Sequence, residues 1–97
     1  MHAVFVEVDI NLEDGFSIDE ARKRLQENAP QMAREAGARS AYWLAPQGGR
    51  GVSVAIFDSK EEADKLASRF HVGEAPPQAP PGVTFRTVEV REVVASL

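Results

Sequence analysis

The sequence predicts one α+β domain with the element order βαββαβ. Four short segments show strand-like runs of apolar residues, clearest as period-two alternation in the first, and two intervening segments carry apolar residues at helical spacing behind a serine that can cap a helix. The chain has 97 residues, which suits a single domain spanning 1–97. These observations predict a four-stranded antiparallel sheet with two helices on one face.

The first strand and helix are predicted over residues 3–36. Residues 3–10 alternate, so a β-branched face from Val4 to Ile10 is expected to pack against helices. Asp14-Gly15 is the expected turn, and Ser17 with Glu20 forms a capping box that opens a helix stopped by Gly37. Pro30 predicts a kink or a break in this helix.

The middle of the chain predicts a β-hairpin. Residues 38–46 read as a strand ended by Pro46, and the glycine-rich residues 47–51 read as the turn. Residues 52–57 follow as a third strand, and the apolar residues on both of its faces are typical of a central strand.

The last third of the chain predicts a helix, a stiff connection and a long strand. Ser59 and Glu62 form a second capping box. Residues 71–82 hold Pro76, Pro77, Pro80 and Pro81, which favour an extended conformation, so we expect a loop there. Residues 83–94 are predicted to form the last strand, whose apolar phase shifts after Phe85 and indicates a bulge or a change of facing.

The predicted arrangement is ferredoxin-like, and it leaves one sheet face without helices. Phe5, Ala55 and Phe57 are expected on that face, together with an ion pair of Glu7 or Asp9 with Arg86 or Arg91. An apolar patch of this kind is typical of an interface, so we expect a homodimer whose sheets face each other as a dimeric α+β barrel.

Three stretches carry a resemblance to a known superfamily. They are Val4–Ile10, the run Ala33–Gly37 leading into Ala41-Tyr42-Trp43, and Val54–Ala63. The chain resembles the dimeric α+β barrel proteins, which include antibiotic-biosynthesis monooxygenase-like domains and stress-responsive barrel proteins. The resemblance implies, as one alternative, a cofactor-independent monooxygenase or isomerase that needs no metal or flavin, and Trp43 is the residue that matches the pocket of those enzymes.

Composition argues against several classes of function. The net charge is −4 and the pI is about 5.1, so we expect no nucleic-acid partner, and the basic residues of the first helix read as solvated surface. Cysteine is absent and the two histidines lie far apart in sequence, so neither a metal site nor a cofactor is expected. No segment resembles a membrane span or a signal peptide, which predicts a cytoplasmic protein.

The sequence predicts a small-molecule site, aromatic ligands included, between the first helix, the sheet and the 71–82 loop. Trp43 and Tyr42 point to opposite faces of a strand, so one of them can form a wall. His71 and Arg86 flank the loop and could supply polar groups. The loop itself could be a lid hinged at Gly73 and Gly82 that hydrogen-bonds poorly to the body, a passive connector, or a proline-rich interaction segment. Packing for Trp43 and a helix-end charge for His71 are the structural alternatives.

Overall fold

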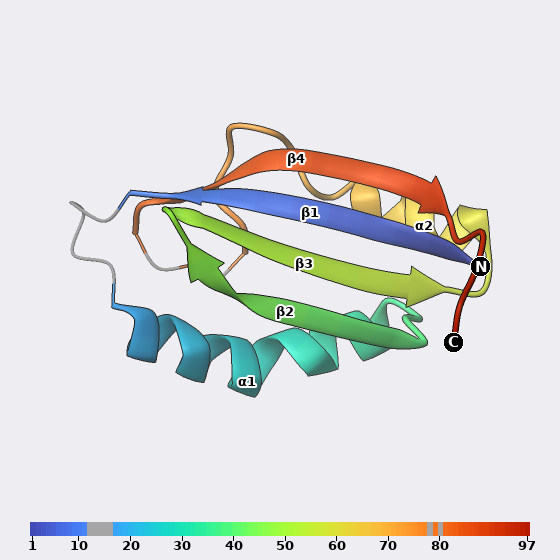
Figure 1. Ribbon diagram of the computed structural model, residues 1–97, viewed down its shortest axis with the longest axis horizontal. Helices are drawn as coiled ribbons and strands as arrows, with labels where there is room; N and C mark the ends of the chain where they lie inside the picture. The colour runs from blue at the N-terminus through green and yellow to red at the C-terminus, as the bar shows by residue number, and fades with distance from the viewer. Residues whose placement is uncertain (12–16, 78, 80) are drawn as a thin grey trace.

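The chain forms the predicted βαββαβ order in a computed structural model that describes residues 1–11, 17–77, 79 and 81–97. The elements along the chain, shown in Figure 1, are β1 (His2–Ile10), α1 (Ile18–Glu35), β2 (Ser40–Gln47), β3 (Arg50–Phe57), α2 (Lys60–Ala67) and β4 (Val83–Glu92). The expected turn at Asp14-Gly15 and the expected contribution of Pro80 lie outside the described residues.

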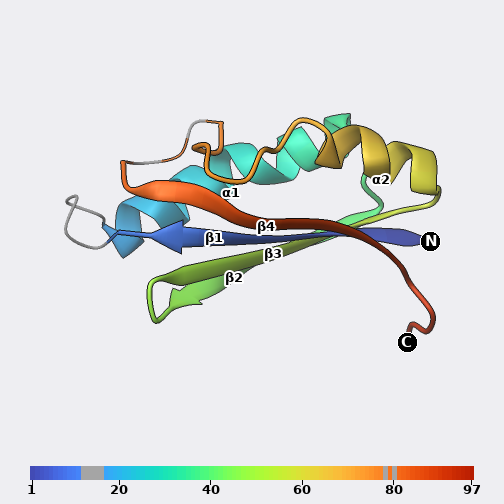
Figure 2. The same ribbon diagram turned by 90° about the horizontal axis from the view of Figure 1, so that it is seen from above.

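The sheet confirms the predicted ferredoxin-like fold. Its strand order is β2-β3-β1-β4, and each neighbouring pair is antiparallel. Both helices cover the same face, and the C-terminal segment leaves the sheet on the opposite side (Figure 2). Whether two such sheets face each other as a barrel stays a prediction.

The buried core lies under α2 at one part of the helix-covered face. Val4 and Val6 of β1 point toward the helices, as the alternation predicts, and they are almost fully buried. Phe57, Ala63, Leu66 and Phe85 complete the cluster. Phe70, just beyond the end of α2, stacks on Phe85 with ring centroids 4.8 Å apart. Aliphatic burial and this aromatic pair therefore fix α2 against β1 and β4.

The register of β3 corrects the expected face of two residues. Val4 pairs with Ala55 and His2 with Phe57, and directly paired residues share a face, so both residues lie on the helix side. Phe57 is 0% exposed. The sequence prediction was wrong because β3 is apolar at nearly every position, so its pattern does not show which residues face the helices. The open face instead carries Phe5 with a set of residues from β2 and β3: Tyr42, Leu44, Val52, Val54 and Ile56.

The hairpin between β2 and β3 is confirmed, but Pro46 does not end its first strand. Gly48 and Gly49 have φ values of 60° and 73°, which suits the tight two-residue turn. β2 continues through Pro46 to Gln47, with a register shift between Leu44 and Gln47. Because β2 is an edge strand, a residue without an N–H is tolerated there.

The predicted bulge in β4 is confirmed. Glu7 pairs with Thr87 whereas Val8 pairs with Phe85, so Arg86 is the extra residue. The bulge keeps Phe85 and Val88 on the apolar side of the strand although three positions separate them.

Helix α1 is a single helix that contains Pro30. Its start is capped as predicted, since the Ser17 hydroxyl accepts the Glu20 N–H at 3.3 Å, and Gly37 follows its end with a φ of 94°. Of the expected kink or break, the break is wrong, because α1 runs from Ile18 to Glu35 with Pro30 inside it and exposed; a kink stays a prediction.

We expect Pro30→Ala to stabilise the protein by about 1–2 kcal/mol. Alanine restores a backbone donor in the helix interior, and greater freedom of the unfolded chain offsets part of that gain. Urea unfolding followed by circular dichroism measures the difference. A loss of stability above about 1 kcal/mol would show that Pro30 is required by its surroundings.

Candidate functional site

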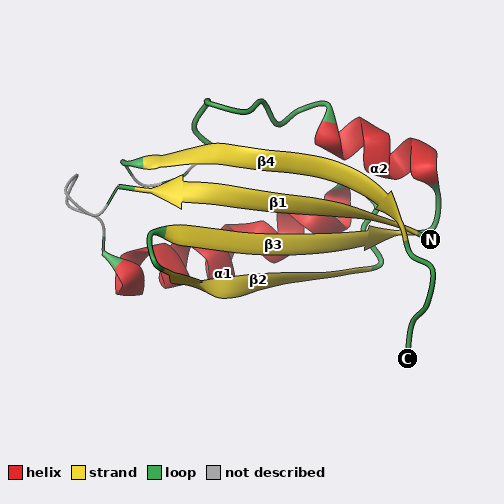
Figure 3. Cartoon of the chain, turned by 45° about the horizontal axis from the view of Figure 1, so that its top comes forward, coloured by secondary structure: helices red, strands yellow, loops and turns green. Residues whose placement is uncertain are grey.

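A cavity lies where α1 stands over the sheet. The two helices cover different parts of the sheet, α2 near β4 and α1 behind β2 and β3 (Figure 3). Helix α1 buries Ala29 and Ala33, whereas Leu25 and Met32 stay more than a third exposed. Below it, β3 turns Gly51, Ser53 and Ala55 toward the helices. Because these facing side chains are small, they leave a cavity of about 500 Å³.

The cavity wall is mainly apolar. α1, the sheet and the 71–82 segment all contribute to it, the last through Pro76, Pro77 and Ala79. Trp43 of β2 forms part of the wall together with aliphatic residues of β1 and α1 and with Phe70 and Phe85. Ligand pockets in proteins hold about 300–1,000 Å³ and are lined in this manner. The cavity therefore has the size and lining of a site for a small organic molecule.

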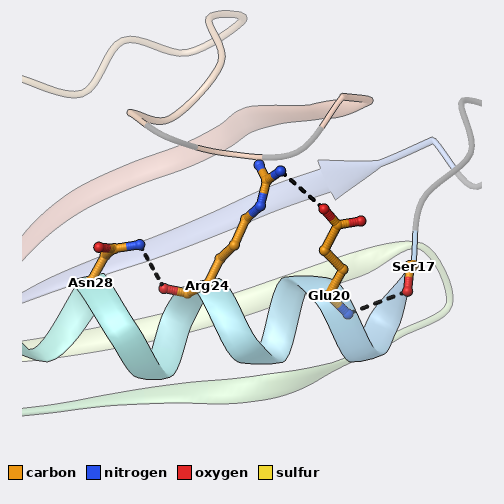
Figure 4. A network of polar contacts seen from close by, with 4 residues as sticks. All are labelled: Ser17, Glu20, Arg24 and Asn28. Atoms are coloured by element: carbon orange, nitrogen blue, oxygen red, sulfur yellow. Dashed lines mark hydrogen bonds and ion pairs between the residues drawn. The ribbon is translucent and has the colours of Figure 1, made fainter.

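Polar groups enter the cavity chiefly from one stripe of α1. Arg24, Asn28, Gln31 and Glu35 are spaced by four, three and four residues, which places them on one side of the helix. Arg24 Nη2 lies 3.0 Å from Glu20 Oε1, and Asn28 Nδ2 donates to the Arg24 carbonyl at 3.2 Å (Figure 4). Gln31 Nε2 donates to Glu35 Oε1 at 3.2 Å. The stripe thus gives an otherwise apolar cavity one polar side.

Of the four residues predicted to form the site, the structure brings Trp43 to the cavity. Tyr42 lies on the open face of the sheet and is 61% exposed. His71 is exposed and is not part of the wall. Arg86 is held elsewhere by Asp9, whose Oδ1 lies 3.3 Å from its Nη1. One aromatic wall and no predicted polar group therefore reach the cavity.

The ion pairs expected on β1 are confirmed in part. Asp9 pairs with Arg86 as predicted. Glu7 instead approaches Arg50 of β3, at 3.8 Å, and Arg91 pairs with Glu89 of its own strand. Strand order explains the difference, because β1 lies between β3 and β4 and each of its side chains can find a cation on either neighbour.

The polar residues of the cavity were missed by the sequence analysis. The basic residues of the first helix, Arg24 among them, were assigned to solvated surface, and Asn28, Gln31 and Glu35 were not assigned to any site. The available signal was the spacing of Arg24, Asn28, Gln31 and Glu35, which runs beside the apolar stripe of Ala21, Leu25 and Met32. Because α1 stands away from the sheet, this stripe borders the cavity although Asn28, Gln31 and Glu35 remain exposed to solvent.

The loop that closes one side of the cavity is tied to the sheet at its two ends. Gly73 N–H donates to the Phe85 carbonyl at 2.8 Å, and Phe85 N–H donates to the Glu74 carbonyl at 2.9 Å. Asn11 N–H donates to the Gly82 carbonyl at 2.8 Å. The expectation of poor hydrogen bonding is therefore wrong at residues 73, 74 and 82. Motion of the loop as a lid stays a prediction.

Comparison with known proteins supplies no relative. No protein-family model, curated protein or solved structure matches the chain. The resemblance to the dimeric α+β barrel superfamily, with the oxygenase activity it implies, consequently stays a prediction. Within residues 1–11, 17–77, 79 and 81–97, no three side chains of the metal-ligating types gather at one place. No helix in those ranges is long and apolar enough to cross a membrane.

We expect Leu66→Ala to cost far more stability than Leu25→Ala. Leu66 is 6% exposed within the core, so its truncation should lower the free energy of unfolding by about 2–5 kcal/mol. Leu25 is 39% exposed beside space that is already empty, and its truncation should cost about 1 kcal/mol or less. Urea unfolding of both variants measures this. Equal losses would mean that α1 packs directly onto the sheet and leaves no cavity.

Proposed function

We propose that this protein is a homodimer that binds a small apolar molecule, aromatic molecules included, in the α1 cavity. The observation that carries the proposal is an apolar cavity of about 500 Å³ with Trp43 in its wall and one polar side. The proposal needs no metal or organic cofactor.

A ligand in the α1 cavity would restore contacts that the fold leaves unmade. Protein interiors are close-packed, and side chains that line an empty apolar space lose dispersion contacts on one side. Gly51 and Ala55 contribute little volume to the floor of the cavity, and Trp43 offers a flat ring for stacking. A flat apolar molecule would fill this space without displacing any buried hydrogen bond of the sheet.

A second copy of the chain is the proposed cover for the open sheet face. Tyr42 and Leu44 are 61% and 57% exposed there, and Phe5, Val54 and Ile56 lie beside them only partly buried. An apolar surface of this extent favours an interface. The charges around it are already neutralised within the chain, for example by the pairs of Asp9 with Arg86 and Glu7 with Arg50. A twofold contact between two such faces would therefore bring no unpaired charge into the centre.

We expect the neutral fluorophore phenylnaphthylamine to bind the cavity with a Kd of about 1–100 micromolar. Trp43 is the single tryptophan of the chain, so energy transfer from it to the naphthyl ring reports binding at this site. Ser53 faces the cavity between Val6 and Trp43, and Ser53→Leu should weaken binding at least about tenfold by filling the space.

Ser53→Ala is the matched control, because it removes the same hydroxyl without filling the cavity. Its affinity for phenylnaphthylamine should stay within about twofold of the parent protein. Absence of energy transfer in the parent protein, with the fold intact by circular dichroism, would overturn the proposed function.

We expect the protein to sediment as a dimer at micromolar concentration and Tyr42→Asp to shift it toward monomer. The new carboxylate would be desolvated within the proposed interface, which should weaken association at least about tenfold. Val72→Asp is the control, since Val72 is 65% exposed on the loop after α2. Sedimentation equilibrium measures both variants. A monomeric parent protein, or equal effects of the two substitutions, would contradict the assignment of this face.

A further inference from the structure

The charges on the cavity wall are separated along α1. Among the described residues that line the cavity, Arg24 is the one cation and Glu35 the one anion. They lie eleven residues apart on the same helix, which corresponds to about 16 Å along its axis. The cavity therefore has a cationic end and an anionic end, with the neutral amides of Asn28 and Gln31 between them on α1 and an apolar wall opposite.

We propose that the cavity selects an apolar monoanion, a carboxylate or sulfonate on a mainly apolar body, and that Arg24 binds its charged group. This inference rests on the proposed small-molecule function and adds the chemical class of the ligand.

The neutral polar groups of the stripe are already engaged with their own helix. The Asn28 amide donates to the Arg24 carbonyl at 3.2 Å, and the Gln31 amide donates to Glu35 at 3.2 Å. The guanidinium of Arg24 carries five N–H donors, and its contact with Glu20 runs through Nη2. Arg24 thus keeps donors for a ligand in a geometry that suits a planar oxyanion.

The ion pair that Arg24 forms now is easily shared or exchanged. Figure 4 shows the side chains of Arg24 and Glu20 extending from α1 side by side. Their side chains are 42% and 56% exposed, and exposed pairs at this helical spacing contribute little to stability. Arg24 belongs to the cavity wall and Glu20 does not, so a ligand anion in the cavity would reach the guanidinium without meeting the Glu20 carboxylate in the wall.

The net negative charge of the chain disfavours anionic ligands, so a measured preference for an anion would have to come from a cation in the cavity wall. A net charge of −4 disfavours an anion at long range, although salt screens that effect. A preference for an anionic ligand over its neutral analogue must then come from a local cation. Of the residues that line the cavity and are described, Arg24 is the one that can supply it.

The test compares two probes that share one skeleton. Anilinonaphthalene sulfonate differs from phenylnaphthylamine by a single sulfonate, and energy transfer from Trp43 reports both. We expect Arg24→Gln to weaken binding of the sulfonate about tenfold while it changes binding of the neutral probe less than about twofold. Glu20→Gln should tighten binding of the sulfonate about twofold, since it releases the guanidinium.

Two exposed residues of α1 outside the cavity wall provide matched controls. Arg22→Gln repeats the charge change of Arg24→Gln, and Glu27→Gln repeats that of Glu20→Gln. Both should leave the affinity for the sulfonate within about twofold, because exposed charges off the site are screened.

The outcomes separate this inference from the function on which it rests. If both probes bind the parent protein equally and Arg24→Gln weakens neither, the cavity binds ligands without the proposed charge selection and the inference is overturned. If Arg22→Gln weakens the sulfonate as much as Arg24→Gln does, the effect is one of overall charge and the inference again fails. If neither probe binds, the proposed function itself fails.

Discussion

The small side chains on the helix side of β3 are the constraint on which the rest of the structure depends. Gly51 allows Val8 to approach so closely that a β-carbon at position 51 would lie 3.0 Å from its Cγ2. Ser53 and Ala55 continue this shallow floor until Phe57 ends it with a fully buried ring. The sheet is therefore well filled under α2 and poorly filled under α1, and the cavity follows from that difference.

On its other face, β3 carries large aliphatic side chains. Val52, Val54 and Ile56 alternate with the small residues and face away from the helices. One strand thus places small side chains on the cavity side of the sheet and large aliphatic side chains on the open side. Because side chains alternate strictly along a strand, both surfaces are specified within the eight residues from Arg50 to Phe57.

The sequence was sufficient for the fold because its local signals agree with one another. The capping serines at 17 and 59, the glycine turn at 48–49 and the phase shift after Phe85 each predict a feature that the structure contains. It was not sufficient for the facing of β3, where Ala55 and Phe57 were assigned to the wrong side. When a strand is apolar on both faces, its pattern does not show which side chains face the helices. Their facing depends on the register of pairing with β1, which the local sequence does not specify.

The candidate site was harder to predict because it depends on the distance between α1 and the sheet. Trp43 was identified because the single tryptophan of the chain, placed on a strand, is large enough to form a wall in either a core or a pocket. Arg24 was missed because a charged residue beside an apolar helical stripe ordinarily faces water. We infer that the distance between α1 and the sheet is set by Ala29 and Ala33, the two residues that the helix buries, together with the small side chains of β3. None of these residues predicts a cavity by itself. The cavity is predictable only when the small residues of α1 and those of β3 are known to face each other.

Pro30 affects the stability of α1 beside the cavity. It follows the buried Ala29 and lies on the exposed side, so its pyrrolidine ring makes no demand on the cavity. Its missing N–H removes the helical hydrogen bond to the Gln26 carbonyl, one turn earlier in α1. The residues that line the cavity from α1 therefore come from both sides of a weakened turn, with Arg24 before it and Gln31 and Glu35 after it. A helix in full contact with the sheet would have packing to offset this loss. α1 buries two alanines over 18 residues, whereas α2 buries Ala63 and Leu66 over eight, so we infer that α1 depends more on its Ser17 cap and its helical ion pair than α2 does on its own.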